Sequence, residues 1–248
     1  MFKTIGLVFT MAFAFMVVPQ CKAATLEEIL RVNWNKQSLP ELKGLIPDLK
    51  AAQQFATEVM LQEPHTEPDY VFRLGVSEEV VVEYEFVDLK GDGSVQLVCL
   101  LDITGRMRPT ILMAVENDHG HLKTDYLTGG EGGLGLGELR YIIKDIKHDG
   151  KSEITLDNAL EPFAGTTAPT PYLEHIYLYQ DGKFVPSDRE FLDYYKNESL
   201  PKRRQELNDL LQHAPPANAS RGDQEFHRKS VDAKKVEIEA LNKLLSQP

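Results

Sequence analysis

Two acidic loops of matching sequence carry the strongest chemical signal in this chain. The first reads Asp88-Leu-Lys-Gly-Asp-Gly-Ser-Val-Gln, and the second, 57 positions later, reads Asp145-Ile-Lys-His-Asp-Gly-Lys-Ser-Glu. A loop with side-chain oxygens at positions 1, 3, 5 and 9 and a carbonyl at position 7 wraps a hard cation. Glycine at position 6 takes the sharp turn that brings the carboxylates together. The spacing therefore points to calcium.

The candidate ligands occupy positions 1, 5 and 9 of each loop: Asp88, Asp92 and Gln96 in the first, and Asp145, Asp149 and Glu153 in the second. Position 3 is Lys90 in one loop and Lys147 in the other, and an ammonium group cannot coordinate a cation, although it can take the ion's place. Because Gln96 is neutral as well, the second loop is the better candidate calcium site. In the first, we expect a tight turn whose aspartates cap backbone amides.

The two loops and their expected flanking strands resemble the FG-GAP or VCBS-type repeats of integrin-like β-propellers, which have the form D-x-[ND]-x-D-G-x-x-[DE]-hydrophobic. The resemblance covers residues 80–159 and implies calcium-binding loops in repeats that present surfaces to ligands. Two repeats cannot close a propeller, because propellers typically have four or more blades. We therefore expect an open, partly propeller-like fragment whose exposed edges are covered by helices.

Other motifs point less clearly to chemistry. The glycine-rich run Gly129–Gly137 contains G-x-G-x-x-G, but a dinucleotide site needs a following helix, and residues 139–146 have the pattern of a strand. We expect a hairpin or an inter-blade loop there. His119 and His121 flank a glycine and fit a solvated turn, since no third zinc ligand follows at a telling spacing.

The start of the chain has the form of a secretory signal peptide, assigned to residues 1–23. Its apolar run, Ile5–Val18, is shorter than the roughly 20 residues that a membrane-spanning helix needs. No later apolar run is long enough to span a membrane. The mature protein is therefore expected to be periplasmic or secreted, without a transmembrane anchor.

The net charge limits the kinds of molecule that this protein is expected to bind. The formal net charge is −11, and loss of Lys3 and Lys22 with the leader makes it two units more negative. Such a field repels phosphate backbones, which argues against a nucleic-acid partner and is compatible with cations or basic proteins.

Removal of Cys21 leaves Cys99 alone, inside an apolar run that predicts a buried strand.

The overall pattern predicts an α+β fold with a mainly antiparallel β domain. Capping-box spacings at Thr25 and Ser38 begin helices near the N-terminus. The expected regions are, in order, a helical segment at 25–62, the β domain of seven or eight strands at 70–186, packing helices at 187–212, a linker at 213–224, and a charged helix at 225–248.

Several tyrosines lie late in the chain. On a strand, Tyr177 and Tyr179 share the face opposite Ile176 and Leu178, so one pair is expected in the core. The other pair either packs beneath the following helix or is exposed. An exposed tyrosine pair suits a carbohydrate or protein ligand.

Together these features favour an exported, non-enzymatic binding or structural module that is stabilised by calcium. Two alternatives remain. One is a periplasmic inhibitor or immunity-type protein, whose negative charge steers it onto a basic enzyme. The other is an extracytoplasmic hydrolase, which would hold two carboxylates about 5 to 9 Å apart in a pocket near the glycine-rich loop.

Overall fold

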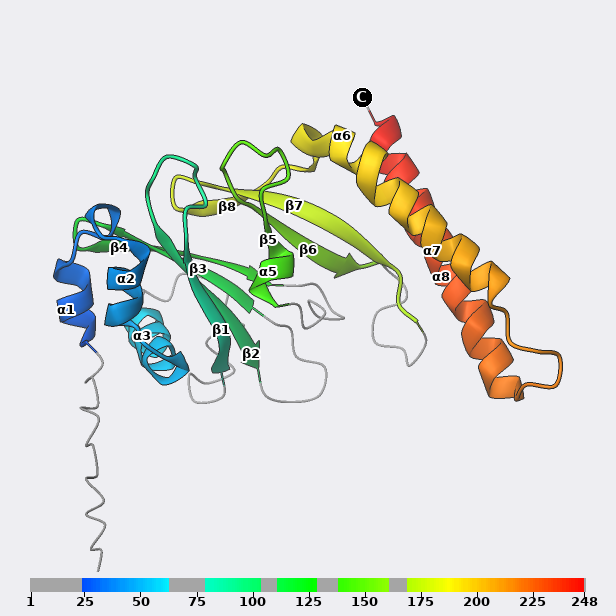
Figure 1. The fold of residues 1–248 in the computed structure, drawn as a ribbon, viewed down its shortest axis with the longest axis horizontal. Coiled ribbons are helices and arrows are strands. Elements are labelled where there is room, and N and C mark those ends of the chain that lie inside the picture. The colour runs from blue at the N-terminus through cyan, green and yellow to red at the C-terminus, as the bar shows by residue number, and fades with distance from the viewer. Residues whose placement is uncertain (1–23, 63–78, 104–110, 129–137, 161–168, 248) are drawn as a thin grey trace, which may run out of the picture.

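A computed structural model describes residues 24–62, 79–103, 111–128, 138–160 and 169–247. Two four-stranded antiparallel sheets form its centre, and helices from the two ends of the chain flank them (Figure 1). The predicted α+β fold is confirmed. The signal peptide and the glycine-rich loop lie outside the described residues.

Each sheet is a simple meander in which neighbours in sequence are neighbours in space. Sheet A contains β1 (Glu79–Val87), β2 (Gln96–Ile103), β3 (Ile111–Asp118) and β4 (His121–Thr128). Sheet B contains β5 (Ile143–Lys144), β6 (Glu153–Ala159), β7 (Tyr172–Gln180) and β8 (Lys183–Pro186). Short links between consecutive strands explain the antiparallel pairing, because a parallel pair would need a long crossover.

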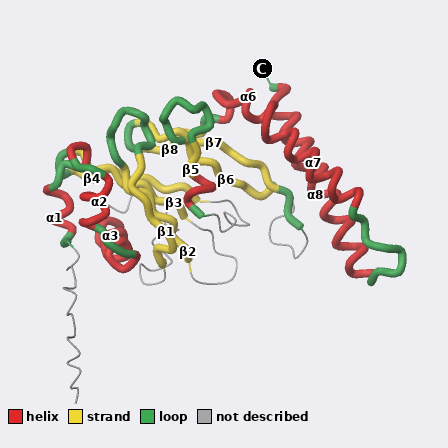
Figure 2. Tube along the Cα trace, in the orientation of Figure 1, coloured by secondary structure: helices red, strands yellow, loops and turns green. Residues whose placement is uncertain are grey.

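The internal repeat extends beyond the acidic loops to the whole four-stranded unit. In each sheet an acidic loop joins the first strand to the second, and a two-residue turn joins the third to the fourth. The turns contain His119-Gly120, with φ of 54° and 90°, and Asp181-Gly182, with φ of 52° and 82°. Two positive φ angles in succession are typical of type I′ hairpins, whose twist matches that of the strands. Figure 2 shows both acidic loops, in green, on the same side of the molecule.

Helices at the N-terminus cover the outer face of sheet A. They are α1 (Leu26–Arg31), the 3₁₀ turn η1 (Trp34–Lys36), α2 (Leu39–Leu45) and α3 (Leu49–Gln62). Both capping boxes are confirmed, because the Thr25 and Ser38 backbone amides donate to Glu28 and Glu41 at 2.7 and 2.8 Å. These reciprocal bonds satisfy amides that a helix start leaves without partners.

Helices at the C-terminus cover the outer face of sheet B. They are the 3₁₀ turn η2 (Asp188–Phe191), α6 (Leu192–Tyr194), the π-helical turn η3 (Tyr195–Ser199), α7 (Leu200–Gln212) and α8 (Arg221–Ser246). Helices α7 and α8 form a hairpin (Figure 1). The last helix begins at Arg221 rather than at residue 225, because the Ser220 hydroxyl caps it by accepting from the Asp223 amide.

Three apolar clusters hold these layers together. Cys99 on β2 and Met113 on β3 face the N-terminal helices, whereas Val98 and Leu112 face sheet B. A third cluster joins the other face of sheet B to the C-terminal helices. The helices therefore cover the outer faces of the two sheets, and α3 also lies against the edge strand β1, whose Val81 amide donates to Gln53 Oε1 at 2.6 Å. Burial of Cys99 is confirmed, and it raises the pKa of the thiol to about 12.

One strand prediction is wrong. Residues 139–146 form a helical turn, α5 (Leu139–Ile142), before the two-residue strand β5. The Leu139 amide donates to the Glu83 carboxylate at 2.6 Å, and Leu139 and Ile142, three residues apart, are both buried against the sheets. Tertiary contacts thus override the period-two pattern. None of the helices in the described ranges has the length and apolar character needed to span a membrane.

Candidate functional site

The first aspartate of each acidic loop accepts hydrogen bonds from backbone amides further along its own loop. Asp88 accepts from the amides of Lys90, Gly91 and Gly93, at 3.1, 2.7 and 2.7 Å. In the second loop, the carboxylate of Asp145 accepts from the amides at positions 149 and 150, at 3.0 and 3.1 Å. Asp92 and Asp149 each accept from the amide two residues on. The two loops therefore share the hydrogen bonds to the amides at positions 6 and 7, whereas the other bonds of the first aspartate differ.

The two lysines at position 3 turn to acids outside their own loops. The Lys90 ammonium lies 2.6 Å from a carboxylate oxygen of Glu116 on β3. The Lys147 ammonium lies 3.7 Å from Glu190 and 4.2 Å from the centre of the Phe191 ring. Both contacts tie a loop to a neighbouring element.

The ninth position distinguishes the two loops. Both ends of the Gln96 side chain have a partner, because its oxygen accepts from the Leu89 amide at 2.8 Å and its nitrogen donates to Ser94 Oγ at 3.0 Å. Glu153 is fully buried, and only one of its oxygens has a partner, the Ile146 amide at 2.8 Å. Burial, followed by the charges of the two loop aspartates, raises the pKa of Glu153. A nearby cation or a bound proton would satisfy the second oxygen.

The candidate calcium ligands are close enough to interact electrostatically, but they do not form a complete cage. Among the described residues, no three His, Cys, Asp or Glu side chains are placed together as a metal site. In the first loop Gln96 is neutral and both of its polar atoms already have hydrogen-bond partners, so this loop offers less charge to balance a cation. The second loop fits better, because Glu153 Oε1 has no partner and Asp145 and Asp149 influence its pKa.

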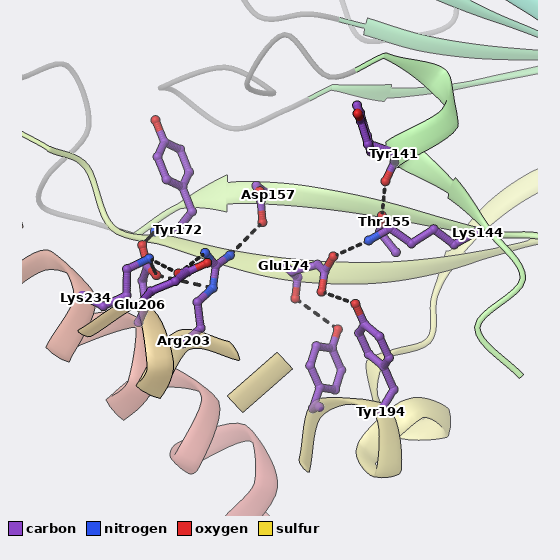
Figure 3. Close-up of polar contacts among 12 residues, drawn as sticks. Tyr141, Lys144, Thr155, Asp157, Tyr172, Glu174, Tyr194, Arg203, Glu206 and Lys234 are labelled. Carbon is purple, nitrogen blue, oxygen red and sulfur yellow. Dashed lines mark hydrogen bonds and ion pairs between the residues drawn. The ribbon is translucent and has the colours of Figure 1, made fainter. Parts of the chain in front are cut away.

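A larger candidate site lies between sheet B and the C-terminal helices. It is a cleft of about 610 Å³, within the size range of small-molecule sites. Figure 3 shows Lys144, Asp157 and Glu174 on the strands, and Tyr194 and Arg203 on the helical side. Strands and helices therefore each contribute one polar wall.

Asp157 and Glu174 stand directly opposite each other on β6 and β7. Two like charges in this position repel, and each is balanced by a cation. Lys144 lies 2.8 Å from Glu174, and Arg203 lies 3.6 Å from Asp157. Burial and the charge of Glu174 raise the pKa of Asp157, while Arg203 opposes that rise.

Tyr194 completes the polar wall around Glu174. Its hydroxyl donates to Glu174 Oε2 at 2.9 Å, while Lys144 binds Oε1. Both oxygens of this carboxylate therefore have partners. Burial, reinforced by the charge of Glu174, raises the pKa of Tyr194 and keeps the phenol protonated.

A buried ionic network fixes the helical wall. Glu237 on α8 is 4% exposed and accepts from Lys234 at 2.5 Å and from the Tyr172 amide at 3.1 Å. Arg203 lies 3.4 Å from the same carboxylate, and Glu206 binds both cations. Burial alone would lower the pKa of Arg203, but the surrounding acids raise it. The network joins α7 and α8 to the start of β7.

A second clamp holds the π-helical turn beside the cleft. Asp188 accepts from the Ile176 amide and from the Tyr195 hydroxyl, both at 2.7 Å, and pairs with His175 at 2.7 Å. Burial alone would raise the pKa of Asp188, but these hydrogen bonds outweigh it and lower the pKa. Tyr195 is fully buried, so the adjacent Tyr194 is held in place.

The tyrosine hypothesis is only partly correct. Ile176 and Leu178 pack against the C-terminal helices, but Tyr179 is buried between the two sheets, with its ring centre 5.3 Å from that of Phe184. Tyr177 is half-buried in the same cluster. Because both faces of β7 are covered, this pair does not form an exposed ligand surface.

The other sequence motifs do not enter the cleft. His119 and His121 are exposed at the β3–β4 turn, which confirms the solvated turn. The element after the glycine-rich run is a helix, contrary to the prediction, but it has a single turn. The Leu139 amide at the start of this helix donates a hydrogen bond to the Glu83 carboxylate. It is therefore not free to bind a nucleotide phosphate.

Sequence reasoning missed the cleft because its residues come from distant positions. Lys144 and Glu174 are 30 positions apart, and Arg203 is on a helix that follows the sheet. In comparisons with known protein families, with curated proteins and with solved structures, this chain matches none.

Proposed function

We propose that this protein is an exported, non-enzymatic binding module whose ligand occupies the cleft between sheet B and α7. The observation that carries the proposal is a polar cleft of about 610 Å³ in which the sheet B residues Asp157 and Glu174 are each paired with a cation, Arg203 and Lys144. Fixed pairs on two rigid walls orient a ligand without reorganisation, which lowers the cost of binding. In this proposal each sheet is one FG-GAP or VCBS-type repeat. The acidic loop and the two-residue turn that recur in both sheets support this assignment.

The pairing favours binding over catalysis. A general base or a nucleophile needs a free lone pair that points at the substrate. Glu174 uses one oxygen for Lys144 and the other for Tyr194. Asp157 is half-exposed and lies 3.6 Å from Arg203 through one oxygen, so it is less fully engaged than Glu174. These acids support the walls of the cleft.

Hydrolysis is a second candidate because Asp157 and Glu174 face each other in the cleft. Opposite residues on antiparallel strands have β-carbons about 5 Å apart, close enough for their carboxylates to act on one glycosidic bond. The raised pKa of Asp157 suits a general acid. Turnover of aryl glycosides by the wild type, and its loss in Asp157→Asn, would support this candidate over a pure binding module.

We also propose that calcium stabilises the second acidic loop. Asp145, Asp149 and Glu153 would hold the ion, and calcium would neutralise the buried carboxylate. The unpartnered oxygen of Glu153 supports this assignment. We expect the role to be structural, because Lys151 of this loop packs against Gly91 of the first loop.

An NMR screen tests the binding proposal. Uniformly ¹⁵N-labelled protein from Ala24 onward is mixed with pools of small oligosaccharides, peptides and nucleotides. Amide shifts that change first around Lys144, Glu174 and Arg203, and that disappear in a Glu174→Gln variant, are expected. Lys123→Met, which removes the exposed Lys123–Asp118 pair on sheet A, is the matched control. Shifts elsewhere, or none with any pool, would contradict the proposal.

A further inference from the structure

We infer that the ligand of this cleft is an extended basic peptide segment of another protein, which adds a strand to the free edge of β6. The inference rests on the proposed function and names the class of ligand. Three observations carry it. The last residues of β6 have no described strand beside them on one side, their backbone groups point to that side, and the cleft reaches the same edge.

Strand β6 extends beyond the end of its neighbour β5. Pairing with β5 stops at Ile154, whereas β6 continues to Ala159 and pairs with β7 over that length. The helical turn α5 takes the place of a longer β5. Figure 3 shows Tyr141 of that turn meeting β6 at Thr155, whose hydroxyl donates to the Tyr141 carbonyl. From Asp157 onward, no described strand lies beside β6 on this side.

The backbone groups of Asp157 and Ala159 point toward this open side. In an antiparallel sheet, two residues that stand directly opposite each other either bond to each other or both point away. Asp157 and Ala159 stand opposite Glu174 and Tyr172. The Tyr172 amide donates to α8 and the Glu174 carbonyl accepts from η3, so both point away from β6. Asp157 and Ala159 therefore point away from β7.

These edge groups are open to a further strand. Each of the two residues offers one N–H and one C=O. Among the described residues, none outside the strand ladder hydrogen-bonds to them. The far edge of β7 differs, because the Tyr172 amide, the Glu174 carbonyl and the Ile176 amide all have partners. A free strand edge is a template for another extended chain, since a second backbone presents donors and acceptors at the same spacing.

The cleft gives an added strand room beside this edge. Thr155, Leu156 and Asp157 line it along β6, and Lys202 and Arg203 line it on α7. Neighbouring strands lie about 4.8 Å apart, and their side chains alternate between the two faces of the sheet. A strand paired with Asp157 would therefore enter the cleft, with alternate side chains on the face that α7 covers.

The charge of the whole protein favours a basic peptide. The cleft lining carries charges of both signs, so its own groups do not set the preference. The formal net charge of the chain is −11, and such a field draws cationic segments toward the protein. The Asp157 side chain is 49% exposed, so a basic side chain opposite it on the added strand would form a favourable cross-strand pair.

The test uses ¹⁵N-labelled protein from Ala24 onward and a capped hexapeptide of alternating valine and lysine. We expect the peptide to bind, to slow hydrogen exchange of the Asp157 and Ala159 amides about ten-fold, and to bind more weakly as salt is added. A copy with glutamate in place of lysine should bind more weakly. A fully N-methylated copy keeps the charge but has no backbone N–H to pair, so it should not bind.

A pair of variants tests the edge from the side of the protein. Ala159→Pro removes the edge donor, and Ala159→Ser, which keeps it, is the matched control. Proline is tolerated on an edge strand where the N–H points outward, so we expect the variant to fold. Ala159→Pro should weaken binding about five-fold, as the loss of one hydrogen bond predicts, and Ala159→Ser should not. If Ala159→Pro does not fold, the N-methylated peptide decides.

The outcomes separate this inference from the proposed function. If other ligand pools shift the amides of Lys144 and Arg203 but the hexapeptide does not bind, the cleft is a ligand site and the inference is wrong. Equal binding of the N-methylated or the acidic copy would also overturn it. If the Asp157 and Ala159 amides become protected without peptide as protein concentration rises, a second copy occupies the edge and the inference fails. If no probe binds, both are wrong.

Discussion

Gln96 and Glu153 occupy the same position in two copies of one loop, but only the glutamine has both ends of its side chain hydrogen-bonded. Each accepts from the amide of the loop's second residue at 2.8 Å. The two side chains therefore differ only at their second polar atom, which is Nε2 in Gln96 and Oε1 in Glu153. We expect that atom to determine how each loop responds to pH and to calcium.

Replacing Glu153 by Gln should stabilise the calcium-free protein at neutral pH. The folded state raises the pKa of Glu153, so it favours the protonated form, and the wild type loses stability as pH rises from about 4.5 through the folded pKa. A neutral amide avoids this loss. We expect a gain of about 1 kcal/mol at pH 7, which disappears below pH 4, in urea unfolding with chelator present.

The reverse substitution in the first loop is the matched control. Gln96→Glu should destabilise the protein at pH 7, because it buries a carboxylate oxygen in place of the amide nitrogen that donates to Ser94. Equal stability of Glu153→Gln and wild type across the whole pH range would show that the buried carboxylate costs nothing.

Calcium should raise the melting temperature through the second loop. Ligand at 100 times its dissociation constant stabilises a fold by about 2.7 kcal/mol, which corresponds to a shift of several degrees. The wild type should respond to millimolar calcium by differential scanning fluorimetry, and the Asp145→Ala/Asp149→Ala double variant should not. Asp88→Ala, in the first loop, should keep the response. A response that survives in the double variant would place the ion elsewhere.

Gly91 should tolerate alanine less well than Gly93. Both have positive φ, 70° and 85°, so both substitutions carry a backbone cost of about 1 kcal/mol. An added Cβ at Gly91 would also lie 2.9 Å from the Lys151 Cβ in the second loop, whereas nothing lies within 4 Å at Gly93. We expect Gly91→Ala to cost about 1 to 3 kcal/mol more in chemical denaturation. Equal effects would mean that the loops do not pack together.

Glu237→Ala should destabilise the attachment of α7 and α8. The substitution removes one of the two acids shared by Arg203 and Lys234, the more buried one, and removes the acceptor of the Tyr172 amide. Loss of one partner of a buried ion pair costs about 3 kcal/mol. Glu225→Ala, which removes an exposed pair with Lys229 on the same helix, should leave the unfolding midpoint unchanged. Similar midpoints for both variants would contradict the role of the buried network.

The sequence by itself determined the features that depend on local interactions. The capping boxes at Thr25 and Ser38 begin helices where their spacing predicted, because both partners lie within one turn. Period-two alternation located most strands, and the apolar run around Cys99 predicted its burial. The matching acidic loops revealed the repeat, whose four-stranded unit the structure shows in full.

Only the tertiary structure decided the features that depend on distant contacts. Residues 139–142 became helical because Glu83 binds the Leu139 amide and the sheets bury its apolar side. Tyr179 became core because a second sheet covers its face of the strand. The cleft arose because strand register placed Asp157 opposite Glu174, and α7 then brought Arg203 beside them. No spacing along the chain encodes these distances, because side chains from separate elements meet only when the layers pack.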